Sequence, residues 1–159
     1  MVDQLRDKIT AAARAALSAS EAVRSEATDG ATPEEKREDA RAAQQASTLG
    51  KAQDLRAKRA LAEADQLQQF RPRPLPEKSV IGLGAIVEIE EDESGEGRTF
   101  FLSPVGGGIT LTGPGGDGFL SVVTPASPIG RAVCGKRIGD VIDVTVEGEL
   151  REWTISWVG

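Results

Sequence analysis

The amino-acid sequence predicts an α+β protein in which an N-terminal antiparallel coiled-coil helical hairpin precedes a small β-sheet domain with one short helix. Residues 1–70 hold long alanine-rich runs with few breaks, whereas residues 79–159 hold short alternating apolar runs separated by glycines. Residues 71–78 lie between them and contain the run RPRPLP. Alternate prolines cannot continue a helix and favour an extended linker, so we expect a domain boundary there.

The first helix is expected from Val2 to Ala27, a stretch without proline or glycine. Small or aliphatic residues recur in it at spacings of four and three, which is typical of a coiled-coil seam: Leu5, Ile9, Ala12, Ala16, Ala19 and Val23. Because most of them are alanine, a second helix can approach closely. A helix of this length reaches roughly 40 Å.

The second helix is expected from Pro33 to Phe70. Thr32 is its predicted N-cap, Pro33 its first helical residue, and Glu35 completes a capping box. Gly50 interrupts the helix at a cost of about 1 kcal/mol relative to alanine, which suggests close packing or a slight bend. The residues expected to face the first helix are Ala42, Ala43, Ala46, Leu49, Ala52, Leu55, Leu61, Leu67 and Phe70.

The connection between the two helices is acidic. Residues 28–39 hold five carboxylates against Lys36 and Arg37, namely Asp29, Glu34, Glu35, Glu38 and Asp39. Acidic residues at a helix start complement the helix dipole, which is one interpretation of Glu34 and Glu35. The other interpretation is a functional tip at the end of a helical stalk.

In the C-terminal half, strands are expected at residues 85–91, 99–102, 109–111, 119–123, 141–146 and 150–158, with an exposed acidic turn at 90–96. Apart from the strand at 109–111, the glycine-rich stretch 105–118 is expected to be a flexible loop. In the last strand, Trp153, Ile155 and Trp157 alternate onto one face, so both tryptophans are predicted in the core.

One short helix is expected within TPASPIGRAVCGKRIGD, residues 124–140. Ser127 is its predicted N-cap and Pro128 its first residue, and Arg131 to Cys134 continue it. Gly135 is expected to close the helix in a left-handed conformation, and Gly139 with Asp140 to turn the chain into the next strand.

Composition excludes several classes of function. The 159 residues include no histidine and one cysteine, Cys134, so a histidine-dependent zinc site, a histidine-dependent catalytic triad and an internal disulfide are excluded. Residues 1–75 hold 13 Lys and Arg against 12 Asp and Glu, and residues 76–159 hold 6 against 13. Neither half therefore offers a strongly basic surface for duplex nucleic acid.

The sequence has neither a leader nor an apolar stretch of about 18 residues. We therefore expect a cytoplasmic protein that does not associate with membranes.

Residues 79–159 resemble the C-terminal domain of the Gre transcript-cleavage and elongation factors (GreA/GreB-like) of bacterial RNA polymerase. The resemblance rests on the serine-proline start at 127–128, the short helix with Arg131, the Gly135 and Lys136 pair, and the Gly139 and Asp140 turn before a valine-rich strand. The order of a helical hairpin followed by a sheet domain is similar to the family along the whole chain.

This resemblance implies an FKBP-like sheet domain that docks on the rim of the polymerase secondary channel while the hairpin enters the channel. In the family, acidic tip residues help to hold the second catalytic Mg²⁺ and position a water, so that the polymerase cleaves backtracked RNA. Carboxylates suit this role because Mg²⁺ takes hard oxygen ligands. The implied protein is a monomeric accessory factor and no enzyme by itself; it binds no cofactor alone and contacts backtracked RNA indirectly.

Carried onto this sequence, the resemblance assigns Asp29, Glu34 and Glu35 to the tip, where they would assist catalysis by the polymerase. Asp29 and Glu35 would share its Mg²⁺. At the other end of the chain, Ser127, Pro128, Ile129 and Arg131 would bind the polymerase.

The tip departs from the family pattern of an aspartate and a glutamate three residues apart. With that glutamate aligned on Glu35, Thr32 stands in place of the aspartate. Next to the docking residues, Ala126 stands where an acidic residue is sometimes found.

Three alternatives remain open beside the cleavage factor. The first is a Gre-like inhibitor or modulator that occupies the channel without stimulating cleavage. The second is an FKBP-like peptidyl-prolyl isomerase or chaperone, which would need an aromatic-lined pocket built from Phe100, Phe101, Phe119 and the two tryptophans. The third is a structural coiled-coil dimer in which the hairpin pairs with a second copy.

Overall fold

The computed structural model describes residues 1–26, 36–73, 75–76, 79–116, 118–146 and 148–159. The chain forms two compact units. The hairpin unit spans Arg6–Asp65, and the sheet unit combines Met1–Leu5 with Gln66–Gly159.

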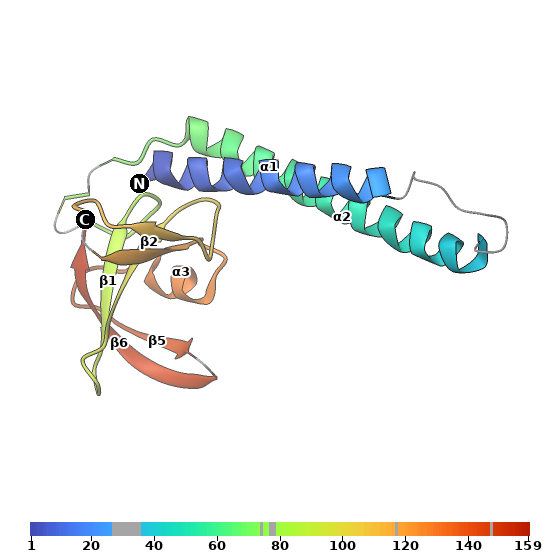
Figure 1. Ribbon diagram of the computed structural model, residues 1–159. Helices are drawn as coiled ribbons and strands as arrows, with labels where there is room; N and C mark the ends of the chain where they lie inside the picture. Colours follow the sequence, from blue (N-terminus) through green and yellow to red (C-terminus); the bar gives the residue numbers. More distant parts are fainter. Residues whose placement is uncertain (27–35, 74, 77–78, 117, 147) are drawn as a thin grey trace. The chain divides into compact units, whose positions relative to one another are not determined.

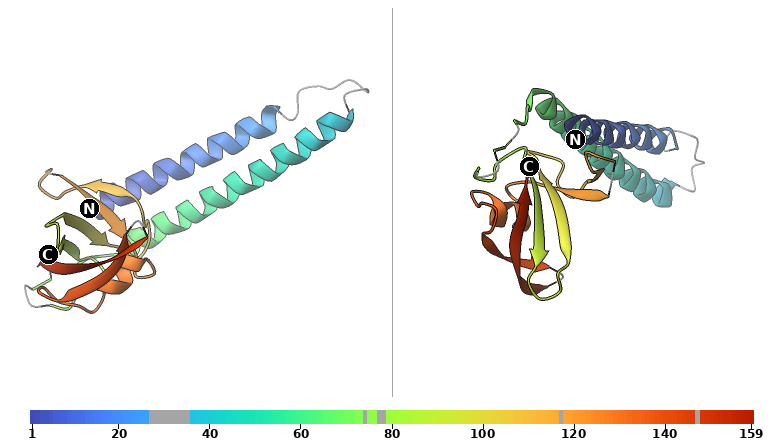
Figure 2. Two further views of the ribbon diagram at one scale, coloured as in Figure 1. Left: turned by 90° about the horizontal axis from the view of Figure 1, so that it is seen from below. Right: turned by 90° about the vertical axis from the view of Figure 1, so that its left-hand side faces the viewer.

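Two antiparallel helices form the hairpin, as Figures 1 and 2 show. Helix α1 spans Val2–Glu26 and α2 spans Lys36–Gln69. The predicted helical hairpin is thereby confirmed. The predicted capping residues Thr32, Pro33 and Glu35 lie outside the described residues.

The buried stripe of α1 differs from the predicted seam at two positions. Leu5 and Ile9 are buried as predicted, but Ala13 and Ser20 are buried in place of Ala12 and Ala19, which are exposed. Successive helical residues turn by about 100°, so Ala13 and Ser20 continue the stripe begun by Leu5 and Ile9. Ala12 and Ala19 lie to one side of it.

On α2 the predicted seam is wrong for its leucines other than Leu67. Leu49, Leu55 and Leu61 are 50%, 51% and 43% exposed, and Ala52 is also exposed. Among the α2 residues whose burial the structure describes, the buried positions are Gly50, Ala57 and Ala64, each seven residues from the next, followed by Leu67. Small residues line this stripe, and at Gly50 the α2 backbone lies within 3.3 Å of the Ser20 hydroxyl of α1.

A polar contact fixes how the two helices align. The buried Ser20 hydroxyl lies 2.7 Å from Asp54 Oδ1 and 3.3 Å from the carbonyl oxygen of Gly50. A Cβ added to Gly50 would lie 3.9 Å from Ser20 Oγ, an ordinary van der Waals distance. Close packing therefore does not require glycine at this position.

The sheet unit holds a mixed six-stranded sheet in the order β3-β4-β2-β1-β6-β5. Its strands are β1 (Ile86–Glu91), β2 (Gly97–Leu102), β3 (Thr110–Thr112), β4 (Phe119–Val123), β5 (Val141–Val146) and β6 (Glu149–Val158). Neighbouring strands are antiparallel except β2 and β4, which are parallel. One short helix, α3 (Pro128–Val133), follows β4, so the predicted α+β class is confirmed (Figure 1).

The core lies between α3 and one face of the sheet. Val133 of α3 belongs to the same buried cluster as Val87 and Ile89 of β1, Phe100 and Leu102 of β2, Ile142 and Val144 of β5, and Trp153 and Ile155 of β6. On the opposite face, Phe101, Leu111, Leu120 and Val122 are also buried. The central strands are therefore covered on both faces over part of their length.

Trp157 does not belong to this core, contrary to the sequence prediction. Trp153 and Ile155 are fully buried, but Trp157 is 47% exposed. A bulge changes the pairing of β1 with β6: Ile89 pairs with Ile155 while Glu88, its neighbour, pairs with Trp157. The extra residue, Ser156, moves Trp157 to the opposite face of the sheet.

Candidate functional site

The segment 124–140 is built around the N-terminus of α3. Ser127 takes an extended backbone conformation, and its hydroxyl oxygen accepts a hydrogen bond from the Gly130 N–H at 3.0 Å. The same hydroxyl donates to the Thr124 carbonyl oxygen at 2.8 Å. Ser127 is thus confirmed as the N-cap and holds the helix against the preceding turn.

The neighbours of Gly130 leave no room for a side chain at this position. A Cβ there would lie 1.9 Å from the carbonyl oxygen of Thr124 and 2.9 Å from Ser127 Oγ. Gly130 is buried, whereas Pro128 and Arg131 on the same helix are exposed. The close contact brings the first turn of α3 directly onto the 124–127 turn and fixes the direction in which Pro128 and Arg131 face solvent.

Backbone hydrogen bonds tie the end of α3 to the sheet unit. Gly135 has a φ of +81°, as predicted for a left-handed cap, and its N–H donates to the Ile81 carbonyl. The Ile81 N–H donates in turn to the Lys136 carbonyl at 2.8 Å, and the Gly139 N–H donates to the Ile155 carbonyl at 2.8 Å. Residues 124–140 therefore form a fixed platform.

The outward surface of this platform is basic and partly apolar. We call it the α3 surface and define it by five of the exposed residues of the segment, Pro128, Arg131, Lys136, Arg137 and Ile138. Its three cations are half of the six Lys and Arg in residues 76–159, a stretch that is acidic as a whole.

The structure places the residues predicted to bind the polymerase on one helix but in different environments. Pro128 and Arg131 are exposed, Ser127 is half-buried as the cap, and the half-buried Ile129 packs against the core. Lys136, Arg137 and Ile138 extend the surface, although the sequence analysis did not assign them to polymerase binding and used Lys136 only as part of the family resemblance. The signal that could have found them is the cluster of cations in an otherwise acidic half.

The predicted tip residues Asp29, Glu34 and Glu35 lie outside the described residues. Among the described residues, no group of three or more acidic or cysteine side chains is arranged to hold a metal ion. None of the described helices has the length and apolar character needed to cross a membrane.

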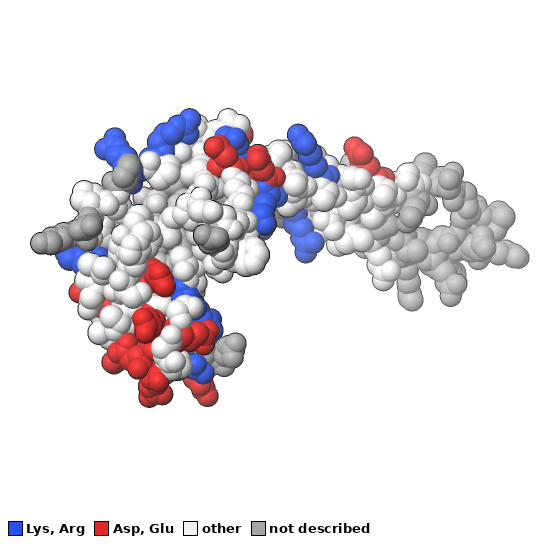
Figure 3. Space-filling model, turned by 60° about the vertical axis from the view of Figure 1, so that its left-hand side comes forward, with Lys and Arg blue, Asp and Glu red and all other residues white. Residues whose placement is uncertain are grey.

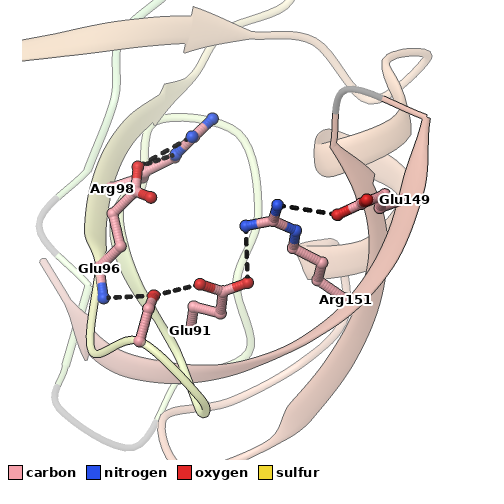
Figure 4. Close-up of polar contacts among 6 residues, drawn as sticks. Glu91, Glu96, Arg98, Glu149 and Arg151 are labelled. Atoms are coloured by element: carbon pink, nitrogen blue, oxygen red, sulfur yellow. Dashed lines mark hydrogen bonds and ion pairs between the residues drawn. The ribbon is translucent and has the colours of Figure 1, made fainter.

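Acidic side chains gather at one end of the sheet unit, around the β1–β2 turn and the β5–β6 ribbon (Figure 3). A hollow of about 750 Å³ there is lined by Glu91, Glu93, Ser94, Asp143, Glu149, Leu150, Arg151 and Glu152. Glu91 is 5% exposed and lies at the centre of a network of polar contacts (Figure 4). Its carboxylate accepts hydrogen bonds from the Ser94 hydroxyl and from Arg151, whose guanidinium also pairs with Glu149.

This network changes the ionisation of its members. The hydrogen bond from Ser94, and after it the bond and charge of Arg151, hold the pKa of Glu91 below its ordinary value even though burial opposes them. The hydrogen bonds to Glu149 and Glu91 raise the pKa of Arg151. Because the buried carboxylate already has its partners, the network has the character of a structural ion pair.

The aromatic residues do not converge on a single pocket. Phe100 and Trp153 are buried in the core, and Phe101 is buried on the opposite face. Phe119 and Trp157 are exposed. The aromatic-lined pocket that an isomerase would need is therefore not formed by these five residues together.

Comparison with known proteins gives a match to one family. Residues 76–159 match the family model described as "Transcription elongation factor, GreA/GreB, C-term", which covers more than half of the chain and includes α3 and the whole sheet. Two curated relatives, from two strains of Thermus thermophilus, are each named "Transcription inhibitor protein Gfh1". Each is 34% identical over 77 residues, which are 48% of this chain and 45% of the relative, so the match spans less than half the length of these relatives.

Solved structures that match this chain include Gfh1 of Thermus aquaticus and of Thermus thermophilus. The first is 20% identical with a TM-score of 0.43, covering 98% of this chain and 92% of that one. The second is 20% identical with a TM-score of 0.39, covering 99% and 94%. A GreA/GreB factor from Nitrosomonas europaea is 18% identical with a TM-score of 0.40, covering 62% and 77%.

Proposed function

Because this chain belongs to the GreA/GreB family of transcription elongation factors, we propose that it regulates transcription by binding RNA polymerase at the rim of the secondary channel. The α3 surface contacts the rim, and the hairpin brings its acidic tip toward the active site. The protein acts as an accessory factor on the catalytic centre of the polymerase and is no enzyme itself. The family match to residues 76–159, which contain the α3 surface, is the observation that carries this proposal.

The construction of α3 supports its role as the docking element. Ser127 and Gly130 fix the helix through short-range contacts, which leaves Pro128 and Arg131 exposed without any need for rearrangement. A preformed surface loses little conformational entropy on binding. The planar guanidinium of Arg131 offers several N–H donors to a carboxylate or carbonyl of the partner.

The carboxylates of residues 28–39 supply the chemistry of the tip. Asp29, Glu34 and Glu35 offer the oxygen donors that Mg²⁺ prefers, and Asp29 with Glu35 is the pair that we assign to the Mg²⁺ of the polymerase active site. Their placement lies outside the described residues, so the assignment rests on residue type and position in the sequence.

A bound tip can have either of two effects on transcription, and different observations favour each. Thr32 replaces the family aspartate, and the curated relatives are named transcription inhibitors, which favours a factor that occupies the channel and inhibits. The carboxylates that remain at the tip favour the second candidate, stimulation of the cleavage of backtracked RNA. We propose inhibition as the principal activity.

Docking is tested by measuring the affinity of the full chain for core RNA polymerase with fluorescence anisotropy. Pro128→Ala with Arg131→Ala removes two exposed side chains while leaving the Ser127 cap and Gly130 intact, so the fold should be unchanged. We expect about tenfold weaker binding, because exposed arginines at interface centres are frequent anchors. Arg73→Ala removes another exposed arginine outside the α3 surface and should bind like the wild type. Equal affinity of all three proteins would overturn the docking assignment.

The effect of the tip is tested on stalled, backtracked elongation complexes. The wild-type chain is compared with the triple variant Asp29→Ala, Glu34→Ala, Glu35→Ala, and both RNA cleavage and RNA extension are followed. An inhibitor slows extension without accelerating cleavage, whereas a cleavage factor accelerates cleavage in the wild type only. If the chain binds the polymerase but changes neither extension nor cleavage, both proposed activities are contradicted. Turnover of a proline-containing tetrapeptide would then be measured to test the isomerase alternative.

A further inference from the structure

A second exposed surface lies on the sheet face opposite α3. We call it the aromatic groove and define it by six of its lining residues: Ile86, Glu88, Thr99, Phe119, Leu120 and Trp157. Its volume is about 320 Å³. Phe119 is 78% exposed, the largest value among the exposed large apolar side chains of the described residues, and Trp157 also faces solvent. Covering the two rings would remove a large apolar area from water.

Strand register places a carboxylate beside the tryptophan. Glu88 pairs with Thr99 of β2 on one side and with Trp157 of β6 on the other, so the three side chains share one face of the sheet. Glu88 is exposed, and within the described part of the chain no Lys or Arg forms an ion pair with it. The groove therefore combines exposed aromatic rings with one negative charge that a cation could neutralise.

The tryptophan ring is held in position by the backbone beside it. The Gly159 N–H donates to the Ile86 carbonyl at 2.9 Å, and the Ile86 N–H donates to the Gly159 carbonyl at 2.7 Å. A Cβ on Gly159 would lie 2.1 Å from Trp157 Cη2, so the indole lies directly against this residue. A ring fixed in this way needs little ordering when a ligand stacks on it.

On the opposite face of the same sheet, an arginine of the chain itself contacts both a tryptophan and a glutamate. There the Arg98 guanidinium carbon lies 5.5 Å from the centroid of the Trp153 ring, and the guanidinium forms an ion pair with Glu96 at 2.8 Å. Arginine is suited to this arrangement because its planar group can stack on an indole while its edge bonds a carboxylate. Trp157 and Glu88 repeat the tryptophan and the glutamate without the arginine.

We infer that the aromatic groove binds a segment of a partner protein that presents an arginine next to a large apolar side chain. The guanidinium stacks on Trp157 and pairs with Glu88, and the apolar side chain covers Phe119. Because the groove and α3 lie on opposite faces of one sheet, both surfaces can be occupied at once. The inference does not depend on the proposed polymerase function.

Model peptides test the inference in the absence of polymerase. The full chain, labelled with ¹⁵N, is titrated with acetylated and amidated peptides of sequence GLRLG and GLELG while the two tryptophan indole N–H signals are followed. We expect the arginine peptide to shift the exposed Trp157 signal in a saturable way and the glutamate peptide to leave it unchanged. The buried Trp153 signal reports that the fold is intact.

Two variants and one control locate the binding. Glu88→Gln should weaken binding of the arginine peptide by about three- to fivefold, since one exposed ion pair and part of the stacking are lost. Phe119→Ser should weaken binding of this peptide further. Glu152→Gln changes an exposed glutamate outside the groove and should leave the affinity for the peptide unchanged. Equal binding of both peptides, or an unchanged Trp157 signal up to millimolar peptide, would overturn the inference. Self-association of the wild type by light scattering, abolished by Phe119→Ser, would also overturn it, because a second copy would then occupy the groove.

Discussion

At the scale of single residues, the sheet unit depends on a few positions where the surroundings permit only one kind of side chain. Gly130 and Glu91 are the clearest cases. The first allows α3 to touch the turn before it, and the second holds a buried carboxylate between a hydroxyl and a guanidinium. Neither environment can be read from the neighbouring residues alone, because each involves a close approach or a partner strand.

Gly130→Ala is expected to lower the free energy of unfolding of the sheet unit by about 1–3 kcal/mol, since the new Cβ overlaps the Thr124 carbonyl and part of the first turn must move. Chemical denaturation followed by tryptophan fluorescence measures this change. Gly82→Ala is the matched control, because a Cβ at Gly82 meets nothing within 4 Å and its φ is not positive. A Gly130→Ala protein as stable as the control would show that the 124–127 turn yields easily.

Glu91→Gln is expected to alter how stability depends on pH. The folded pKa of Glu91 lies below the unfolded value of about 4.3, so its ionised form stabilises the fold above that pH and this contribution disappears as pH falls through the folded pKa. The thermal midpoint of the variant should therefore lie below that of the wild type at pH 7, and the two should converge toward pH 3. Glu93→Gln makes the same change at an exposed neighbour. A difference that is constant from pH 7 to pH 3 would rule out this linkage.

At the scale of elements, the hairpin and α3 gain their stability differently. The helix α3 has only six residues and depends on its caps and on Val133 in the core. The long helices α1 and α2 meet through small side chains, with the Ser20 hydroxyl bridging to Asp54 and to the Gly50 carbonyl. This contact sets which residues of the two helices lie opposite each other.

Gly50→Ala is expected to stabilise the hairpin by about 0.5–1 kcal/mol, because alanine favours the helix and the added methyl meets Ser20 Oγ at an ordinary distance. Thermal unfolding followed by circular dichroism at 222 nm measures it. Ala52→Gly, on the exposed side of the same helix, should destabilise the hairpin by a similar amount. Destabilisation by Gly50→Ala would mean that the methyl disturbs the packing around Ser20.

At the scale of the whole molecule, the chain combines a hairpin with little buried volume and a sheet unit with a large aromatic and aliphatic core. The buried residues of the hairpin unit include Ile9, Ala13, Ala57 and Ala64, whereas the sheet unit buries Trp153, Phe100, Phe101 and many β-branched residues. Burial of apolar area is the main favourable term in folding. The two units should therefore differ in stability.

We expect two separate thermal transitions, with the hairpin unfolding at the lower temperature. Both tryptophans belong to the sheet unit, so their fluorescence reports that unit alone, while the helical signal at 222 nm is dominated by α1 and α2. Ile9→Ala should lower only the helical transition. Superimposable transitions by the two probes would instead indicate that the units unfold as one cooperative body.

The division into a helical hairpin, a sheet and one capped helix could be predicted from the sequence because the signals are local. A run without glycine or proline predicts α1, a long run broken only by Gly50 predicts α2, and the Ser127, Pro128 and Gly135 signals predict α3 within a few residues. The same local signals placed Ser127 to Arg131 on one helix. The assignment of the tip remains a prediction, since its residues lie outside those described.

Only the tertiary structure decided which faces meet. The buried stripe of α2 uses Gly50, Ala57 and Ala64, because close helix packing prefers the smallest side chains over the leucines that hydrophobicity favours. The bulge at Ser156 turns Trp157 outward and so creates the aromatic groove, and the partner of Glu91 comes from a strand 60 positions later in the chain. Composition and local propensity specify the elements of this protein, but strand register and helix approach depend on residues far apart in the chain, and these determine which side chains remain exposed to bind a partner.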